Sequence, residues 1–355
     1  MSEKWPFSRA RPAGFVTDDI PTASELDKID RICSQAADGL SYTDAVLPRN
    51  WVNTATLTSR GDLVFWTGMV WITMHEGGTG PVASYSVDGK RWIPIRNSFG
   101  EIFSTLEIYV SLLSAAVNTG GNVVVVADRS TNVQTVILST DFGFTWSRAS
   151  TPWALDTQKS DVAWAPSANL FVLSTDAGLI ATSPTGTAWT ARTLPSSYGP
   201  GYKLAASPTA IIRADGMGRV YRSVDGIAWT LVDATNLLPK LYEIPLYIPG
   251  LAKFIIWDSS SGFSRVSTDD GLTWSSGPFG PSTIKSAVAF GRMIVCVDTM
   301  ASSEAVVRYS VDGGVSWTIG TIASNAPGSR IALGRGQLLF ADTGGVHYAS
   351  IALGP

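Results

Sequence analysis

Seven acidic side chains recur along the chain, each just after a short apolar run and before small residues, as in "VADRS" and "STDAG". The successive intervals are 52, 48, 39, 43, 40 and 44 residues. Two carboxyl groups held about 5 to 10 Å apart can hydrolyse a glycosidic bond, and about six to eight converging oxygens can bind Ca²⁺. The candidate ligand-face acids are Glu76, Asp128, Asp176, Asp215, Asp258, Asp298 and Asp342.

The spacing of these acids singles out neither a catalytic pair nor a metal site. One acid per repeat spreads the carboxylates around a ring, whereas Ca²⁺ needs them to converge on one point. The chain has two histidines, His75 and His347, too few for a multi-histidine metal site. We therefore expect no catalytic residue, no metal and no cofactor, which favours a non-enzymatic protein. The acids either satisfy their own loop backbone or form an acidic collar that binds cations or a basic partner.

The elements that would position the acids are indicated by a second repeat, a serine followed by Asp, Gly and then Trp. It appears as "SVDGKRW", "STDFGFTW", "SPTGTAW", "SVDGIAW", "STDDGLTW" and "SVDGGVSW", with the leading serines 53, 44, 40, 44 and 43 residues apart. A period of about 40 to 50 residues with several short strands is typical of β-propeller blades. The repeat residues are Ser86, Asp88 and Trp92; Ser139, Asp141 and Trp146; Ser183 and Trp189; Ser223, Asp225 and Trp229; Ser267, Asp269 and Trp274; and Ser310, Asp312 and Trp317.

The repeat has the chemistry of a turn. Serine and aspartate oxygens accept hydrogen bonds from nearby backbone N–H groups, glycine allows a positive φ, and the tryptophan packs as a large apolar wedge. It closely resembles the Asp-box, or BNR repeat, S-x-D-x-G-x-x-W, of sialidases and many other β-propellers. The resemblance implies a structural turn between the third and fourth strands of each blade, away from the ligand face. In the third copy Thr185 replaces the aspartate, so that turn should be weaker.

The same resemblance raises the possibility of sialic acid hydrolysis, which in sialidases uses an arginine triad, a Tyr nucleophile with its Glu, and an Asp acid/base. The nearest approach to the usual first-arginine stretch, "RWIPIR" at 91–96, lies inside the first repeat's outer strand, which is the wrong place. Arg213, Arg265 and Arg308 could point inward, but each fits equally well as a surface strand residue. A sialidase-like glycoside hydrolase or a carbohydrate-binding lectin remains an alternative.

Residues 161–194 illustrate the pattern of four short strands that is expected in one blade. The segments "DVAWAP", "NLFVLST", "GLIATSP" and "AWTARTL" are short, rich in β-branched and aromatic residues, and divided by turn residues. After the sixth repeat, residues 329–353 supply three further strands, and residues 50–58 resemble a fourth strand. We therefore predict an all-β, seven-bladed β-propeller closed by an N-terminal outer strand, with six blades as the runner-up.

The composition of the chain argues against several classes of protein. The chain has 355 residues, 15% of them charged, and a net charge of −3, so it lacks the basic character of a nucleic-acid-binding protein. Its two cysteines, Cys33 and Cys296, provide no disulfide framework. Apolar runs such as 122–128 are too short to span a bilayer, and the start has no apolar signal core. We expect no signal peptide, no transmembrane segment and no membrane partner.

Residues 1–45 are predicted to form an N-terminal anchoring arm, and residues 46–355 the propeller. Within the arm, a helix is predicted at about residues 23–38, beginning at a capping box and ending near Gly39. The arm holds 5 basic and 8 acidic residues, 5 − 8 = −3, and the rest has 21 of each, so all the net charge lies in the arm. The apolar stripe of this helix contains Leu26, Ile29, Ile32 and Cys33.

The stripe packs either on the side of the propeller or on a partner or second copy. The arm, "WPFSRARPAGFVTDDIPTASELDKIDRICSQAADG", resembles the openings of bacteriophage virion proteins, in which a short leader precedes a variable β domain. The resemblance implies a non-enzymatic virion protein. Its arm would dock to the tail or capsid, to other virion proteins or to its own copies. Its propeller would decorate the particle or contact host-surface glycans.

Overall fold

The structure is a computed structural model that describes sixteen stretches of the chain. These are residues 45–46, 52–55, 63–74, 83–95, 112–128, 135–153, 160–195, 201–233, 243–258, 261–282, 284–299, 305–320, 330–334, 336–342, 345–350 and 352–353. Almost all of the described secondary structure is β-strand, and the prediction of an all-β propeller is confirmed. The helix expected at about 23–38 and the apolar stripe of the arm lie outside the described residues.

The described strands form seven four-stranded antiparallel sheets, numbered here in chain order. Sheet 1 comprises β3 (Leu63–Trp66), β4 (Trp71–Met74), β5 (Ala83–Ser86) and β6 (Ile93–Pro94). Sheet 2 comprises β7 (Leu112–Val117), β8 (Val124–Asp128), β9 (Thr135–Ser139) and β10 (Ser147–Ser150). Sheet 3 comprises β11 (Ser160–Ala165), β12 (Leu170–Thr175), β13 (Ile180–Ser183) and β14 (Thr190–Arg192). Sheet 4 comprises β15 (Leu204–Ala206), β16 (Ile211–Ala214), β17 (Val220–Ser223) and β18 (Thr230–Asp233).

The remaining sheets follow the same order of strands. Sheet 5 comprises β19 (Glu243–Ile248), β20 (Lys253–Asp258), β21 (Ser264–Ser267) and β22 (Ser275–Ser276). Sheet 6 comprises β23 (Ile284–Phe290), β24 (Met293–Thr299), β25 (Ala305–Ser310) and β26 (Thr318–Gly320). Sheet 7 comprises β27 (Arg330–Gly334), β28 (Gln337–Asp342), β29 (Gly345–Ser350) and, from the N-terminal side, β2 (Val52–Ala55).

The chain ends meet in sheet 7. Val52 of β2 pairs with Tyr348 of β29, which is the pairing expected between residues 50–58 and the C-terminal strands. A two-stranded pair of β1 (Ala45–Val46) and β30 (Ala352–Leu353) joins the two ends again, so one residue of the predicted arm belongs to a described strand. Because β2 pairs with β29, sheet 7 combines one strand that precedes sheet 1 with three strands that follow sheet 6.

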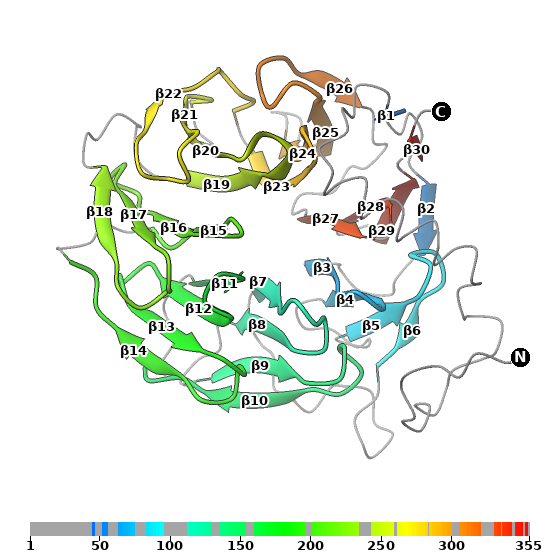
Figure 1. Ribbon diagram of the computed structural model, residues 1–355. Helices are drawn as coiled ribbons and strands as arrows, with labels where there is room; N and C mark the ends of the chain where they lie inside the picture. Colours follow the sequence, from blue (N-terminus) through cyan, green and yellow to red (C-terminus); the bar gives the residue numbers. More distant parts are fainter. Residues whose placement is uncertain are drawn as a thin grey trace, which may run out of the picture.

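The first strands of the sheets lie around the centre of the molecule, and the fourth strands lie at its rim (Figure 1). Each junction between successive sheets holds its own cluster of buried apolar side chains, including the junction of sheets 7 and 1. For example, Ile72 of sheet 1 packs with Val126 and Ile137 of sheet 2. Trp71 and Trp257 are fully buried, which assigns them to the core rather than to ligand stacking.

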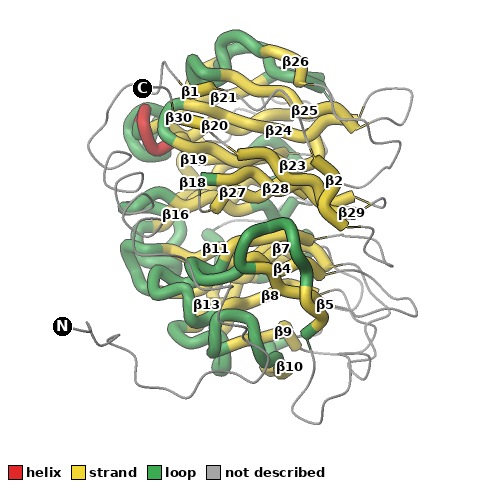
Figure 2. The backbone as a smooth tube through the Cα atoms, turned by 90° about the vertical axis from the view of Figure 1, so that its right-hand side faces the viewer, coloured by secondary structure: helices red, strands yellow, loops and turns green. Residues whose placement is uncertain are grey.

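From the side, the strands run across the molecule from one face to the other, and many of the described turns lie at one of the two faces (Figure 2). The 3-10 helix η3 (Pro249–Leu251) lies in the turn between the first and second strands of sheet 5. No helix among the described residues is long and apolar enough to cross a membrane.

Candidate functional site

The six serine-to-tryptophan segments, called box turns below, each connect the third strand of a sheet to its fourth. In the turn of sheet 6, Ser310 Oγ donates to Asp312 Oδ1 at 2.6 Å and accepts from the backbone N–H of Gly314 at 2.8 Å. Asp312 also accepts from the Ser316 hydroxyl and its backbone N–H. Trp317 Nε1 donates to the Gly314 carbonyl at 3.1 Å. The serine, aspartate, glycine and tryptophan of the motif therefore close the turn on itself.

The other box turns with an aspartate repeat the serine–aspartate bond. Its lengths are 3.0 Å for Ser86–Asp88, 2.8 Å for Ser139–Asp141, 2.9 Å for Ser223–Asp225 and 2.8 Å for Ser267–Asp269. The tryptophan-to-glycine bond is also made by Trp146, Trp189, Trp229 and Trp274. Trp92 differs, because its Nε1 is buried with no hydrogen-bond partner among the described residues.

The turn with Thr185 keeps half of this pattern. Ser183 Oγ accepts from the Gly186 N–H at 2.8 Å, and Trp189 Nε1 donates to the Gly186 carbonyl. The Thr185 hydroxyl lies 2.6 Å from that of Thr187 and accepts from its backbone N–H at 3.4 Å. In the matching turn of sheet 4, Asp225 accepts from two backbone N–H groups at 2.8 Å. The sheet 3 turn therefore has fewer and longer bonds to its own backbone.

Hydrogen bonds hold several box aspartates in their charged form. The Thr273 hydroxyl and N–H lower the pKa of Asp269 to about 2, against a small opposing effect of burial. For Asp312, burial opposes the shift, but bonds from Ser310, Ser316 and Val315 outweigh it and lower the pKa to about 2. These shifts have a structural cause in the turn and need no catalytic explanation.

The box turns also pack closely against the side chains of the preceding sheet. A Cβ added at Gly186, where φ is +77°, would come within 2.7 Å of both Leu138 Cδ1 and Val125 Cγ2 of the preceding sheet. Glycine is required there because the backbone conformation and the close approach both exclude a side chain. The turn of sheet 3 is thus packed directly onto sheet 2.

The six candidate ligand-face acids whose backbone the structure describes lie at or directly after the ends of the second strands, at the opposite end of the sheets from the box turns. Asp215 is fully buried, and its carboxylate accepts from Arg219 Nε at 2.8 Å and from the Met217 N–H at 2.9 Å. Asp298 is 2% exposed and pairs with Arg308 Nε at 2.8 Å. Both carboxylates are therefore engaged by side chains of their own sheet.

The two other acids with described side chains, Asp258 and Asp176, differ in their contacts. Asp258 is fully buried and accepts from the Ser261 hydroxyl at 2.6 Å. Asp176 is half-buried in the turn after β12, with no hydrogen bond or ion pair of its carboxylate among the described residues. Glu76 lies outside the described residues, as do the side chains of Asp128 and Asp342 at the ends of their strands.

The three arginines that could have pointed inward do not form one site. Arg213 is fully buried and donates from Nε to Ser174 Oγ at 2.9 Å. Arg265 is 2% exposed and forms an ion pair with Asp233 of the neighbouring sheet. A surface position is therefore wrong for these two, and each arginine, including Arg308 on Asp298, is bound to a different partner.

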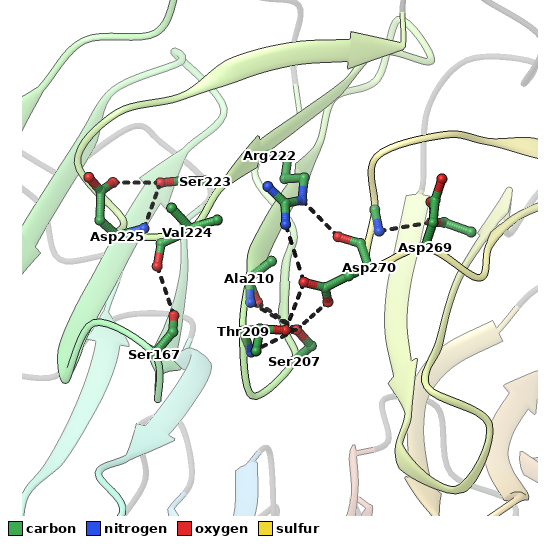
Figure 3. Close-up of polar contacts among 12 residues, drawn as sticks. Ser167, Ser207, Thr209, Ala210, Arg222, Ser223, Val224, Asp225, Asp269 and Asp270 are labelled. Atoms are coloured by element: carbon green, nitrogen blue, oxygen red, sulfur yellow. Dashed lines mark hydrogen bonds and ion pairs between the residues drawn. The ribbon is translucent and has the colours of Figure 1, made fainter.

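A polar cluster at the junction of sheets 4 and 5 was not predicted from the sequence (Figure 3). Asp270 of the sheet 5 box turn accepts from Ser207 Oγ at 2.6 Å and from Thr209 Oγ1 at 2.7 Å. Arg222 of sheet 4 donates to the Asp270 carbonyl at 2.8 Å and pairs with its carboxylate at 3.2 Å. We call these four residues the Asp270 clasp. The only sequence signal is the extra acid in "STDDGLTW".

Among the described residues, no group of three or more His, Cys, Asp or Glu side chains is placed to hold a metal ion. The Cys296 thiol is free and buried, and burial raises its pKa.

A scan against models of known protein families finds no match, and neither does a search of curated proteins. Solved structures share the architecture. A structure of YCF48 bound to D1 peptide matches with a TM-score of 0.60 and 14% identity, over 86% of this chain and 97% of that one. A streptogramin B lyase matches with a TM-score of 0.67 and 9% identity, over 85% and 98%. A GH74 xyloglucanase from Xanthomonas campestris matches with a TM-score of 0.58 and 14% identity, over 86% and 54%. At these identities the likeness establishes the β-propeller fold alone.

Proposed function

We propose that the chain is a non-enzymatic structural protein of a bacteriophage particle. Its N-terminal arm docks to the tail or capsid, and its propeller is displayed to decorate the particle or to contact host-surface glycans. The observation that supports a non-catalytic propeller is the engagement of the loop acids. Asp215, Asp258 and Asp298 are each buried against a partner of their own sheet. A carboxylate that holds its own loop is not poised to transfer a proton to a substrate.

The identity of the box turns and the number of blades are part of the same proposal. The six box turns have the residue order and the position of Asp-boxes, and we take them as members of that repeat. The seven four-stranded sheets are its blades, with sheet 7 closing the ring through β2. A propeller leaves only short, protected sheet edges, and β2 gives sheet 7 the same four strands as the others, which suits a domain displayed in the open medium.

The division of charge supports an interaction role for the arm. Residues 1–45 carry a net charge of −3, whereas the rest of the chain is neutral overall. Charge complementarity steers association and suppresses wrong partners. An acidic arm on a neutral propeller would therefore direct assembly through the arm and leave the propeller free for display.

The direct test is the composition of the particle. Particles of the phage that encodes the chain are purified on a density gradient, and the chain is quantified by mass spectrometry. We expect the full chain in a fixed ratio to the other particle proteins, and a version that lacks residues 1–44 only in the unbound fraction. A full chain found only among free proteins would contradict the proposal.

The hydrolase alternative has its own test at Asp176, the described loop acid with no partner. Reducing-sugar release from a panel of glycans is measured for the wild-type chain and for Asp176→Asn. The proposal predicts no release with either protein. Release that Asp176→Asn abolishes, without a change in melting temperature, would instead identify an enzyme.

A further inference from the structure

Two aromatic side chains on the acid-bearing face stand apart from all others in the described residues. Phe263 is 47% exposed and Phe279 is 61% exposed, whereas the remaining described Phe, Tyr and Trp side chains are buried or half-buried. Their ring centroids are 4.4 Å apart at an interplanar angle of 54°. Phe263 lies between β20 and β21, and Phe279 follows β22, so two separate loops bring the exposed rings together.

The backbone under the two rings is fixed. The Gly280 N–H donates to the Gly262 carbonyl at 2.8 Å, which ties the two loops together beside the rings. The Ser264 hydroxyl donates to the Pro278 carbonyl at 2.6 Å. Gly262 has a φ of +78°, and a Cβ added there would lie 2.5 Å from the Gly280 carbonyl oxygen. The pair is therefore held in place before any partner arrives, which lowers the entropy cost of binding.

The two loop segments that carry the rings contain no charged residue. The loop segments read "SSSGFS" at 259–264 and "SSGPFGPST" at 275–283, without an acidic or basic residue. The charges that flank the first segment, Asp258 and Arg265, are both buried, and each has a partner, Ser261 and Asp233 respectively. After the second segment the next charge is Lys285 of β23, which is exposed. The two segments themselves offer a charged ligand no counter-charge, whereas a neutral ligand would lose no ion hydration.

The segments that carry the rings also contain hydroxyl groups. Ser275 and Ser276 are exposed, and a hydroxyl can both donate and accept a hydrogen bond. The half-buried Ser261 hydroxyl donates to Asp258. A neutral pyranose has a matching pattern, because the C–H groups of one ring face are apolar and its rim is hydroxylated. Its C–H groups can pack on the electron-rich faces of Phe263 and Phe279.

We propose that Phe263 and Phe279 form a binding site for a neutral saccharide on the acid-bearing face of sheet 5. This inference rests on the proposed display function and names the class of glycan that the propeller would contact. The site lies at the acid-bearing end of one sheet, where the buried Asp258 bonds to the loop of Phe263, and it binds without chemical change to the sugar.

Affinity electrophoresis of the full-length chain tests the site. Native gels contain dextran, yeast mannan, galactomannan or hydroxyethylcellulose as neutral polymers, or polygalacturonate as an acidic one. We expect retardation in at least one neutral gel and none in polygalacturonate. Phe279→Ala and the double variant Phe263→Ala/Phe279→Ala should bind at least about ten-fold more weakly. Phe263→Leu/Phe279→Leu keeps an apolar surface but has no ring face, and should bind as weakly as the double alanine variant.

Leu272→Ala serves as the matched control, since Leu272 is 52% exposed in a box turn at the opposite face. It should bind like the wild type, and near-ultraviolet circular dichroism should show that all variants are folded. Retardation in no neutral gel, retardation in polygalacturonate alone, or unchanged binding by either double variant would overturn the inference. Such a failure would leave the particle test untouched, because that test reads assembly through the arm and involves no sugar.

Discussion

At the scale of single residues, each box aspartate replaces water as the acceptor for backbone N–H groups that the turn leaves without a strand partner. Asp225 accepts from the N–H groups of Ile227 and Ala228, both at 2.8 Å. A hydrogen bond to a charged group contributes about 1.5 to 3 kcal/mol, roughly twice a neutral one. A turn closed in this way holds its tryptophan against the neighbouring strand.

Thr185 provides a matched pair for this effect, because its turn has the same length as that of Asp225. We expect Thr185→Asp to raise the free energy of unfolding by about 1 kcal/mol, since the carboxylate can accept from the Thr187 N–H and from Ser183 Oγ. Asp225→Thr should lower it by a similar amount. Urea denaturation of the three proteins measures both changes. If Thr185→Asp lowers the free energy of unfolding, the turn of sheet 3 cannot accommodate a carboxylate that accepts these two hydrogen bonds.

The box aspartates also predict a dependence of stability on pH. An unfolded aspartate has a pKa of about 3.9. Asp312 has a folded pKa of about 2. Because the folded pKa is lower, the stabilisation is fully present above about pH 4 and is lost as the pH falls towards about 2.

Asp312→Asn should therefore be less stable than the wild type at pH 6, and the difference should shrink between pH 4 and pH 2. Urea midpoints at several pH values measure it. Thr187→Ala, in the turn without an aspartate, is the control and should shift stability equally at every pH. A constant difference for Asp312→Asn would contradict the hydrogen-bonded carboxylate.

At the scale of elements, the junction of sheets 4 and 5 is held by the Asp270 clasp as well as by apolar packing. Ser207 and Thr209 come from the turn between β15 and β16, and Arg222 from β17, so one acid of sheet 5 contacts two elements of sheet 4. The carboxylate is 29% exposed, which weakens its ion pair with Arg222 but leaves the hydroxyl bonds in place.

We expect Asp270→Ala to lower the free energy of unfolding by about 1 to 3 kcal/mol, and its effect to be coupled to Ser207→Ala by more than about 0.5 kcal/mol. Asp270 has a φ of +59°, and any backbone strain of the substitution cancels in the double-mutant cycle. Asp269→Ala is the neighbouring control, because Asp269 bonds within its own turn. Additive effects of Asp270→Ala and Ser207→Ala would rule out the clasp as a link between sheets.

The elements also show what could be predicted from sequence. The box turns and the four strands of residues 161–194 were predictable because their signals are local: turn residues, strand-length apolar runs and a fixed period. The contacts of Asp270 and the pair of Phe263 and Phe279 were not, because their partners come from separate loops or sheets. The buried Arg265–Asp233 pair was missed for the same reason, since a strand sequence does not reveal which neighbouring sheet a long side chain meets.

At the scale of the whole molecule, the residues that build the scaffold differ from those proposed to contact partners. The sheet junctions, the box turns and the paired chain ends build the propeller, and the buried acids belong to that construction. The proposed contacts with partners lie elsewhere, in the arm of residues 1–45 for the particle and in Phe263 and Phe279 for a neutral sugar.

The most direct measurement is the molar mass, by light scattering, of the full-length chain and of residues 45–355, alone and with the other particle proteins. The account predicts that the full chain self-associates or enters larger complexes, while residues 45–355 remain a compact monomer with the same circular dichroism spectrum. Identical monomers in both cases, with no complex formed, would contradict it, because the arm would then have no role in assembly.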